Sequence, residues 1–529
     1  MAAAPFRRLL AALFALGLLT ASPVASASAT AAPRPPVASF ADILPAPVSA
    51  VPAAGVSYTL RRTDTLSSDV PGIGGYLAAV LRRSTGYPFR VGTAPGAIAL
   101  LLSGAPASVG PQGYRLDVTA HGVTVRARAA AGLFAGVQTL LQLLPPSVQG
   151  SRVVKTARWT LPGGRVIDHP RYAYRGAMLD VARHFFTVAQ VERYTDQLAH
   201  YKIDYLHLHL TDDQGWRIAI SGLPRLTSHG GSTEVGGGRG GYYTEADYRA
   251  IVRYAQARYI TVVPEIDMPG HTNAALSSYP RLTCDGVVPR LYTGMNVGFS
   301  SLCVRSKATY AFLETVIARL AALTPGPYLH IGGDEAQSTS RADYAAFVNR
   351  VQAIVAARHK TVIGWHDIVA ATLRPSTVAQ FWSSTTGRPG DRAVAAAARR
   401  GTKVIMSPAS RAYLDMRYTS ATRIGADWAG RIDVSKAYDW NPGAYLPGLP
   451  ASAVLGVEAP LWTETVRSSA DLDYLAFPRV AAIAELGWSP ASSHSWPRFR
   501  VRLAAQGPRW RAEGVRYYRS TQIDWPAGS

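Results

Sequence analysis

The segments RGAMLDVA (175–182), YLHLHLTD (205–212), ITVVPEID (260–267) and YLHIGGDE (328–335) share one pattern, a short apolar run that ends in polar or acidic residues. The same pattern returns in TVIGWHD (361–367), TVAQFW (377–382), KVIMSP (403–408) and LGVEAPLW (455–462). Helical patterns fill several of the gaps, at 187–202, 244–259, 307–323 and 340–359. Eight strands with interleaved helices predict an α/β fold, a (β/α)8 TIM barrel over residues 166–520. A doubly wound sheet also alternates strand and helix, but it favours a glycine-rich turn after its first strand, and RGAMLDVARHF has none.

Polar and aromatic residues gather where these predicted strands end. The active sites of such barrels lie at the C-terminal ends of the strands. The residues at those ends are Asp212, Asp267, Asp334, Glu335, Trp365, Asp367, Trp382 and Trp462. Six strands that end in this way are hard to attribute to capping, so the pattern predicts one shared site.

Three regions precede the predicted barrel. Residues 1–30 combine an arginine pair, an apolar run and the small-residue stretch VASASAT, which is typical of a secretory signal peptide. Residues 31–55 are rich in proline and alanine and predict a linker. Residues 56–165 mix alternating strand patterns with helical ones, which predicts a small N-terminal α/β domain.

Composition narrows the possible partners. Apolar residues make up 48% of the 529-residue chain, which excludes a wholly disordered protein. The net charge of +21 raises nucleic acid as a partner, but the arginines are scattered and no nucleic-acid-binding motif occurs. No segment after the first thirty residues is long and apolar enough to span a membrane. We therefore expect a secreted, soluble protein that binds neither nucleic acid nor membranes.

The chain has two cysteines, Cys284 and Cys303. In an exported protein this pair predicts one disulfide, which would stabilise the fold by about 3 kcal/mol through loop closure. The alternative is a pair of free buried thiols.

The segment HIGGDEA (330–336) carries the sharpest chemical signal. Neighbouring residues of an extended strand point in opposite directions, so only a turn can bring Asp334 and Glu335 to one ligand. Two carboxyl groups in one site repel each other, which raises the pKa of one of them. One proton donor beside one ionised partner is what cleavage of a glycosidic bond requires. Tryptophans at three strand ends add flat apolar surfaces that suit sugar rings.

Together, several motifs resemble the family 20 glycoside hydrolases, the β-N-acetylhexosaminidases, and most of all the secreted actinobacterial ones. The matching segments are GLFAGVQTLLQLLP, RGAMLDVARHFF, KIDYLHLHLTDDQGWR, VVPEIDMPGH, YLHIGGDE, GWHD and APLWTE, in family order over roughly residues 55–510. The resemblance implies removal of terminal β-linked GlcNAc or GalNAc from an oligosaccharide or glycan, without cofactor or metal. It also implies a substrate-assisted, retaining mechanism in which the 2-acetamido group of the substrate is the nucleophile.

The resemblance also implies a role for each matching residue. Glu335 would be the general acid and base, Asp334 would hold the acetamido N–H, and Tyr413 would donate to the acetamido oxygen. The tryptophans expected to wall the acetamido pocket are Trp365, Trp382 and Trp462. The residues expected to bind sugar hydroxyls are Arg183, Asp415 and Glu464. Asp212, His271 and Asp267 would form a polar network near the acid, with Asp212 and His271 counted among the substrate-binding residues.

Three other readings compete with this one. A carbohydrate-binding barrel without hydrolysis would share the tryptophans but would not need Asp334, Glu335 and Tyr413 together. A retaining glycosidase with a protein nucleophile would need a second carboxylate about 5 Å from the acid. A metal hydrolase could use His207 and His209, which point to one side of their strand, but no histidine-rich partner motif follows them.

Overall fold

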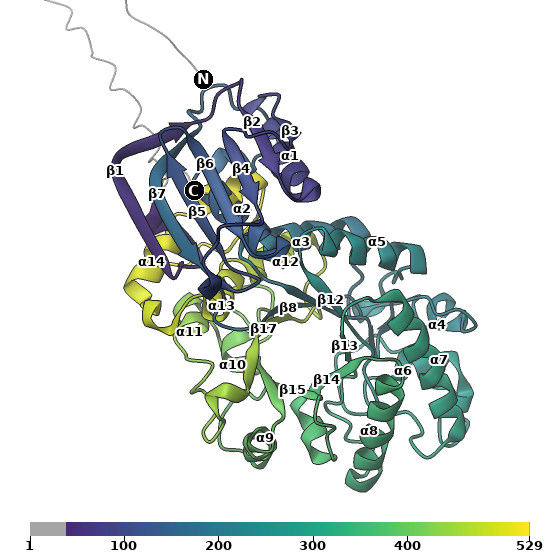
Figure 1. Cartoon of the computed structure of the whole chain (residues 1–529). Helices are drawn as coiled ribbons and strands as arrows, with labels where there is room; N and C mark the ends of the chain where they lie inside the picture. The colour runs from purple at the N-terminus through teal and green to yellow at the C-terminus, as the bar shows by residue number, and fades with distance from the viewer. Residues whose placement is uncertain (1–38, 528–529) are drawn as a thin grey trace, which may run out of the picture. The chain divides into compact units, whose positions relative to one another are not determined.

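A closed barrel of eight parallel strands forms the centre of the computed structural model, which describes residues 39–527 (Figure 1). The barrel strands are β8 (Tyr174–Asp180), β9 (Tyr205–His209), β12 (Thr261–Glu265), β13 (Tyr328–His330), β14 (Thr361–Trp365), β15 (Val378–Phe381), β16 (Lys403–Met406) and β17 (Val454–Leu461). Pairing of β17 with β8, from Gly456–Tyr174 to Leu461–Leu179, closes the ring. The predicted (β/α)8 barrel is therefore confirmed, with its strands in sequence order.

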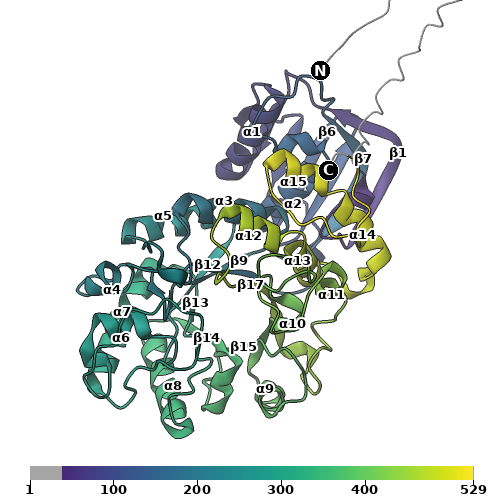
Figure 2. The ribbon, with the colours of Figure 1, turned by 180° about the vertical axis from the view of Figure 1, so that it is seen from behind.

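Helices surround the barrel. The predicted ones are α3 (Val188–His200), α5 (Glu245–Gln256), α7 (Lys307–Leu323) and α8 (Arg341–Ala356). The others are α4 (Arg225–Ser228), α6 (Asn273–Ser278), α9 (Pro389–Arg399), α10 (Ala409–Ala412), α11 (Val434–Tyr438), α12 (Ser469–Ala476) and α13 (Arg479–Trp488). The last two helices, α14 (Trp496–Ala504) and α15 (Gly507–Glu513), lie beside the N-terminal domain (Figure 2). A short hairpin, β10 (Thr211–Asp212) and β11 (Gly215–Trp216), follows β9. Local chemistry sets some ends: Thr244 and Asp247 form a capping box at the start of α5.

The N-terminal α/β domain is a seven-stranded sheet in the order β1-β7-β5-β6-β4-β2-β3. Its strands are β1 (Ser49–Thr59), β2 (Thr65–Ser68), β3 (Arg90–Gly92), β4 (Ile98–Leu101), β5 (Tyr114–Thr119), β6 (Gly122–Ala127) and β7 (Thr160–Asp168). Helix α1 (Pro71–Thr85) packs on β2 and β3, and α2 (Ala130–Gln142) packs on β5 and β6 (Figure 2).

The predicted linker over 31–55 needs correction. Residues 49–55 belong to β1, which pairs antiparallel with β7. Most side chains of this stretch are exposed, so the sequence lacks the alternation of apolar and polar residues that indicates a half-buried strand. The stretch is a strand because it pairs with β7. Strand β7 also continues to residue 168, beyond the predicted domain boundary at 165.

Two further predictions concern the compartment. Cys284 and Cys303 form the expected disulfide, with their Cα atoms 4.8 Å apart. The predicted signal peptide, residues 1–30, and the first part of the predicted linker lie outside the described residues, so export stays a prediction. Within residues 39–527, no helix is long and apolar enough to cross a membrane.

A buried ion pair joins the small domain to the barrel. Lys202, which follows α3, places its Nζ 3.1 Å from Oδ2 of Asp168 in β7, and both side chains are fully buried. Tyr114 and Trp488 donate further hydrogen bonds to the same oxygen, at 2.8 and 2.9 Å. Burial lowers the pKa of Lys202, although Asp168 opposes this shift. The ammonium and the carboxylate therefore depend on each other.

Replacing Lys202 by methionine should destabilise the protein by about 3–5 kcal/mol, because Asp168 would keep a buried charge without a cation. Arg165→Met is the control, since Arg165 pairs with Asp117 at a half-exposed site and such pairs contribute about 0–1 kcal/mol. Thermal unfolding of both variants measures the difference. Equal losses of stability would contradict a structural role for the buried pair.

Candidate active site

The turn after β13 brings Asp334 and Glu335 to one place. Gly332 and Gly333 have φ angles of 63° and 100°, and Glu335 has a φ of 49°, so the chain leaves the extended conformation as the sequence required. A Cβ atom on Gly332 would lie 1.8 Å from Oδ1 of Asp267. The same Asp267 oxygen accepts a hydrogen bond from the Gly333 amide at 3.0 Å. Glycine at 332 is therefore necessary for this turn.

His271 contacts both carboxylates of the turn. Its Nε2 lies 3.7 Å from Asp334 Oδ2 and 3.4 Å from Glu335 Oε2, and its Nδ1 lies 3.2 Å from Asp212 Oδ1. Burial alone lowers the pKa of His271, but the charges of Asp212 and Asp334 outweigh it and raise this pKa well above its ordinary value. The ring therefore favours its protonated form, in which it can donate to the turn that carries Asp334 and Glu335.

Burial and neighbouring charges shift the pKa of the buried aspartates at the turn. Burial raises the pKa of Asp334 to about 7; the cation of His271 opposes this shift and the charge of Glu335 adds to it. Burial, with the charge of Asp334, also raises the pKa of Asp267 well above its ordinary value. Asp267 therefore stays neutral beneath the turn, so that Asp334 can carry the negative charge.

A chain of buried contacts leads from the barrel interior to this turn. Glu265, at the end of β12, lies 2.5 Å from His209 Nδ1. His209 Nε2 lies 2.8 Å from Asp212 Oδ2, and Asp212 contacts His271. Glu265 also accepts a hydrogen bond from the indole of Trp365 at 2.9 Å. One buried carboxylate thus orients groups on both sides of the site.

His207 and His209 point into the barrel, as their alternation in one strand predicts. His207 places Nδ1 2.9 Å from Glu458 and Nε2 2.9 Å from Glu265. Each ring nitrogen of both histidines therefore lies within 2.9 Å of a carboxylate oxygen. Burial lowers the pKa of His207, but Glu458 and Glu265 outweigh it and raise this pKa to about 9.

Arg183 forms the opposite wall of the site. Its guanidinium lies 2.8 Å from Asp212, 3.3 Å from Asp180 and 3.6 Å from Glu464, above the ring of Trp462 at 4.8 Å from the centroid. These partners hold its pKa well above its usual range, although burial alone would lower it. The charged fork is therefore fixed in place and remains available for a polar ligand.

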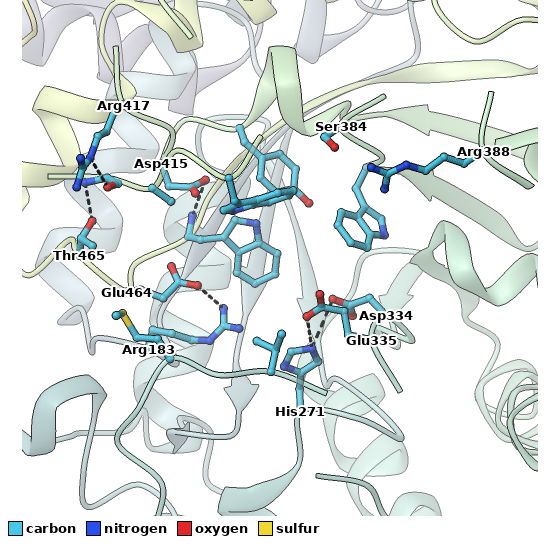
Figure 3. A pocket seen from close by; sticks show the side chains of 18 residues that line it. Arg183, His271, Asp334, Glu335, Ser384, Arg388, Asp415, Arg417, Glu464 and Thr465 are labelled. Atoms are coloured by element: carbon cyan, nitrogen blue, oxygen red, sulfur yellow. Dashed lines mark hydrogen bonds and ion pairs between the residues drawn. The ribbon is translucent and has the colours of Figure 1, made fainter. Parts of the chain in front are cut away.

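The turn and the arginine wall enclose a pocket of about 680 Å³ (Figure 3), a volume typical of ligand sites. Ring contacts connect its aromatic side: Trp428 lies edge-on to Trp382 and Tyr413, at 6.2 and 5.9 Å, and Tyr413 lies 6.3 Å from Trp462. Figure 3 shows Asp334, Glu335 and His271 on one side, with Arg183 and Glu464 on the other. The pocket thus combines aromatic faces with fixed charges.

Most predicted site residues line this pocket: Arg183, His271, Asp334, Glu335, Trp382, Tyr413, Asp415, Trp462 and Glu464. Asp267, expected to support the acid, lies beneath the turn. Trp365 and Asp212 differ from their expected roles. Trp365 is only 1% exposed and packs behind Trp462 at 5.7 Å, so it supports the wall without forming its surface. Asp212 is only 2% exposed and holds Arg183 and His271, so it positions binding groups.

Several pocket residues escaped the sequence reasoning. They are Met295, Val297, Ser384, Arg388, Arg417, Trp428 and Thr465. Most of these residues belong to long irregular loops. The sequence of such a loop does not indicate which side chains face the pocket. Trp428 lies in the segment between α10 and α11 and is 56% exposed, and no periodic pattern around it distinguishes it from a core tryptophan in the sequence.

Comparison with known proteins gives a consistent result. Residues 172–343 and 337–491 match the model of the glycosyl hydrolase family 20 catalytic domain, and residues 41–169 match that of glycosyl hydrolase family 20, domain 2. The β-N-acetylhexosaminidase of Cellulomonas fimi is 43% identical over 492 residues, which cover 92% of this chain and 97% of that protein.

Solved structures agree. A variant of the Streptomyces plicatus β-hexosaminidase in complex with its product GlcNAc is 55% identical, with a TM-score of 0.91 over 94% of this chain and 99% of that one. The family 20 β-N-acetylhexosaminidase from Streptomyces coelicolor A3(2) is also 55% identical, with a TM-score of 0.90 over 92% and 99%.

Replacing Gly332 by alanine should lower kcat by about 100-fold, because the new Cβ must displace Asp267 and with it the catalytic turn. The matched control is Gly110→Ala, which has the same φ of 63° but no atom within 4 Å of an added Cβ. Both variants place alanine at a positive φ, and only the first meets a clash. Steady-state kinetics should therefore separate them, and equal activity of the two would refute the turn's role.

Proposed function

Because the chain belongs to glycosyl hydrolase family 20, we propose that it is a retaining exo-β-N-acetylhexosaminidase that removes terminal, non-reducing GlcNAc or GalNAc. The observation that carries the proposal is the pair of Asp334 and Glu335 on one turn, in a pocket shared with Tyr413 and flanked by tryptophans. A pocket that only bound sugar would not need two adjacent carboxyl groups together with Tyr413.

The substrate supplies the nucleophile in this proposal. The carbonyl oxygen of its 2-acetamido group attacks C1 and forms an oxazolinium ion. The Asp334 carboxylate accepts the acetamido N–H and stabilises the positive charge that develops there. Burial, and then the charge of Asp334, raise the pKa of Tyr413 well above its ordinary value, so its phenol keeps the proton that it donates to the acetamido oxygen.

Glu335 transfers the proton in both steps. As an acid it protonates the departing glycosidic oxygen, and as a base it then takes a proton from the water that opens the oxazolinium ring. His271 lies 3.4 Å from its Oε2 and orients this carboxyl group. The second step returns the acetamido group to its original form, and the anomeric configuration is retained.

The far side of the pocket holds the sugar hydroxyls. Arg183 and Glu464, 3.6 Å apart, offer a donor and an acceptor. Burial, with the charge of Glu464, raises the pKa of Asp415 well above its ordinary value, so its neutral carboxyl can donate as well as accept. This cluster closes the pocket beyond the sugar, which fits removal of terminal residues only.

The proposal includes export of the protein. Disulfides persist in oxidising compartments outside the cytosol, and the Cys284–Cys303 bridge supports such a location.

If the acetamido group is the nucleophile, 4-nitrophenyl β-GlcNAc should turn over while the β-glucoside should turn over barely or not at all. Intramolecular attack by an oriented group can lower the barrier by about 7–11 kcal/mol, and the glucoside lacks that group. A thiazoline analogue of the intermediate should inhibit strongly, because it resembles the bicyclic oxazolinium ion. Covalent labelling of any carboxylate by a 2-fluoro glycoside, with the thiazoline inert, would overturn the substrate-assisted mechanism.

Activity should also depend on the charge of Asp334. Since the pKa of this carboxyl is raised, its neutral form persists to a higher pH than an ordinary aspartate allows. The plot of kcat/KM against pH should therefore fall on its acidic side as the pH drops through about 7. Asp334→Asn should lower kcat by about 100- to 1000-fold and lose this limb. Asp117→Asn in the small domain is the control that keeps it, and a limb that survives in Asp334→Asn would assign it to another group.

A further inference from the structure

A second cavity continues from the active-site pocket past Glu335. It measures about 770 Å³ and lies between the turn after β13 and the start of α9. We call it the α9 groove; its lining includes Gln337, Arg341, Asp367, Ser383, Arg388 and Asp391. The two cavities share Glu335, Trp382 and Arg388, so they form one continuous depression.

The position of Glu335 indicates which part of the substrate would enter the α9 groove. A general acid has to reach the glycosidic oxygen, which joins the sugar being removed to the leaving group. With the terminal sugar in the aromatic pocket, the leaving group extends past Glu335 into the α9 groove. Trp382 stands at the junction, where its ring can pack on the apolar face of a sugar.

The carboxylates and the arginines of the α9 groove differ in how many partners they have within the protein. Asp367 accepts a hydrogen bond from the Trp382 indole at 2.9 Å, and Asp391 accepts one from the Arg388 amide at 2.8 Å. Arg341 and Arg388 are exposed, and within residues 39–527 neither has a carboxylate at ion-pair distance. Figure 3 shows the Arg388 guanidinium beside the pocket, near Ser384. One oxygen of each carboxylate is thus bonded to the protein, and the two guanidinium groups have no anionic partner among the described residues.

Two buried polar atoms of the lining also lack a partner. Among the described residues, the hydroxyl of Ser383 and the Oδ1 atom of Asp391 find no hydrogen-bond partner, although the two side chains belong to residues that are only 4% and 1% exposed. An unsatisfied buried group costs about 1–3 kcal/mol. A hydroxyl group of a bound sugar can supply the missing partner of either atom, because it both donates and accepts, whereas the Asp391 oxygen only accepts.

We propose that the α9 groove binds a carboxylate-bearing sugar on the leaving side of the scissile bond, with Arg388 as the principal contact and Arg341 farther along. The inference rests on the proposed exo-hexosaminidase activity and names the class of sugar that follows the terminal unit. Arginine suits a carboxylate because its planar fork can donate two parallel hydrogen bonds. The preferred substrate is thus an N-acetylhexosamine attached to an acidic sugar, in place of a neutral polymer of one sugar.

The test compares two disaccharides that differ in one charge. The first is GlcNAc β-1,4-linked to N-acetylmuramic acid, and the second is its methyl ester; chitobiose serves as a neutral reference. At low salt the acid should be cleaved with a kcat/KM about tenfold higher than the ester, and added salt should shrink this ratio. Because the ratio is taken within one enzyme preparation, general damage to catalysis cancels out.

Variants then test which arginine causes the preference for the acid over the ester. Arg388→Gln should bring the acid-to-ester ratio close to one, and Arg341→Gln should lower it partly. Arg400→Gln, an exposed arginine at the end of α9 outside both cavities, should keep the full ratio. An unchanged ratio in Arg388→Gln would overturn the proposed contact.

Two outcomes separate this inference from the proposed function. If the acid and the ester are cleaved equally well, or if chitobiose is cleaved and neither muramyl disaccharide is, the groove does not select acidic sugars but the hexosaminidase activity stands. If none of the three disaccharides and no aryl β-N-acetylhexosaminide is cleaved, the proposed function itself fails.

Discussion

Glu265 holds a negative charge at the centre of the barrel, where its side chain is fully buried and water cannot solvate it. Contacts with His330, His207, His209 and the Trp365 indole satisfy this charge. Burial alone would raise the pKa of Glu265, but the interactions with His330, His209 and His207 lower it well below its ordinary value. A buried carboxylate without such partners would destabilise the fold, so the partner side chains are fixed in their positions. The site is built on those oriented groups.

Two routes lead outward from Glu265 to the pocket. Through His209 and Asp212 it orients His271, which faces the catalytic turn. Through Trp365 it supports Trp462, whose ring forms a pocket wall. The acidic turn and the aromatic wall are thus positioned by one buried group, which explains why strands far apart in sequence end in residues that act together. Preorganised groups of this kind stabilise developing charge without rearranging during the reaction.

Much of the fold could be predicted, and the reasons are local. Each barrel strand is buried on both sides and therefore appears as a short apolar run, as in YLHLHLTD and ITVVPEID. Strand β1 escaped prediction because residues 49–55 are mostly exposed and rich in alanine and proline, so nothing but pairing with β7 makes them a strand. Trp428 escaped because an irregular loop carries no periodicity that indicates which side chains face inward.

The sequence by itself determined the barrel, the acidic turn and most of the predicted pocket residues. Buried strands appear in the sequence as short apolar runs, and the glycine pair indicates the turn. Tertiary structure alone decided which of these residues line the pocket and which lie behind its surface. Trp365 and Asp212 both end strands, as Trp462 does, yet they lie behind the pocket surface. The physical reason is how deeply each side chain is buried. The end of a strand places a residue near the mouth of the barrel, but packing against neighbouring strands decides whether its side chain reaches the pocket or is covered by another side chain.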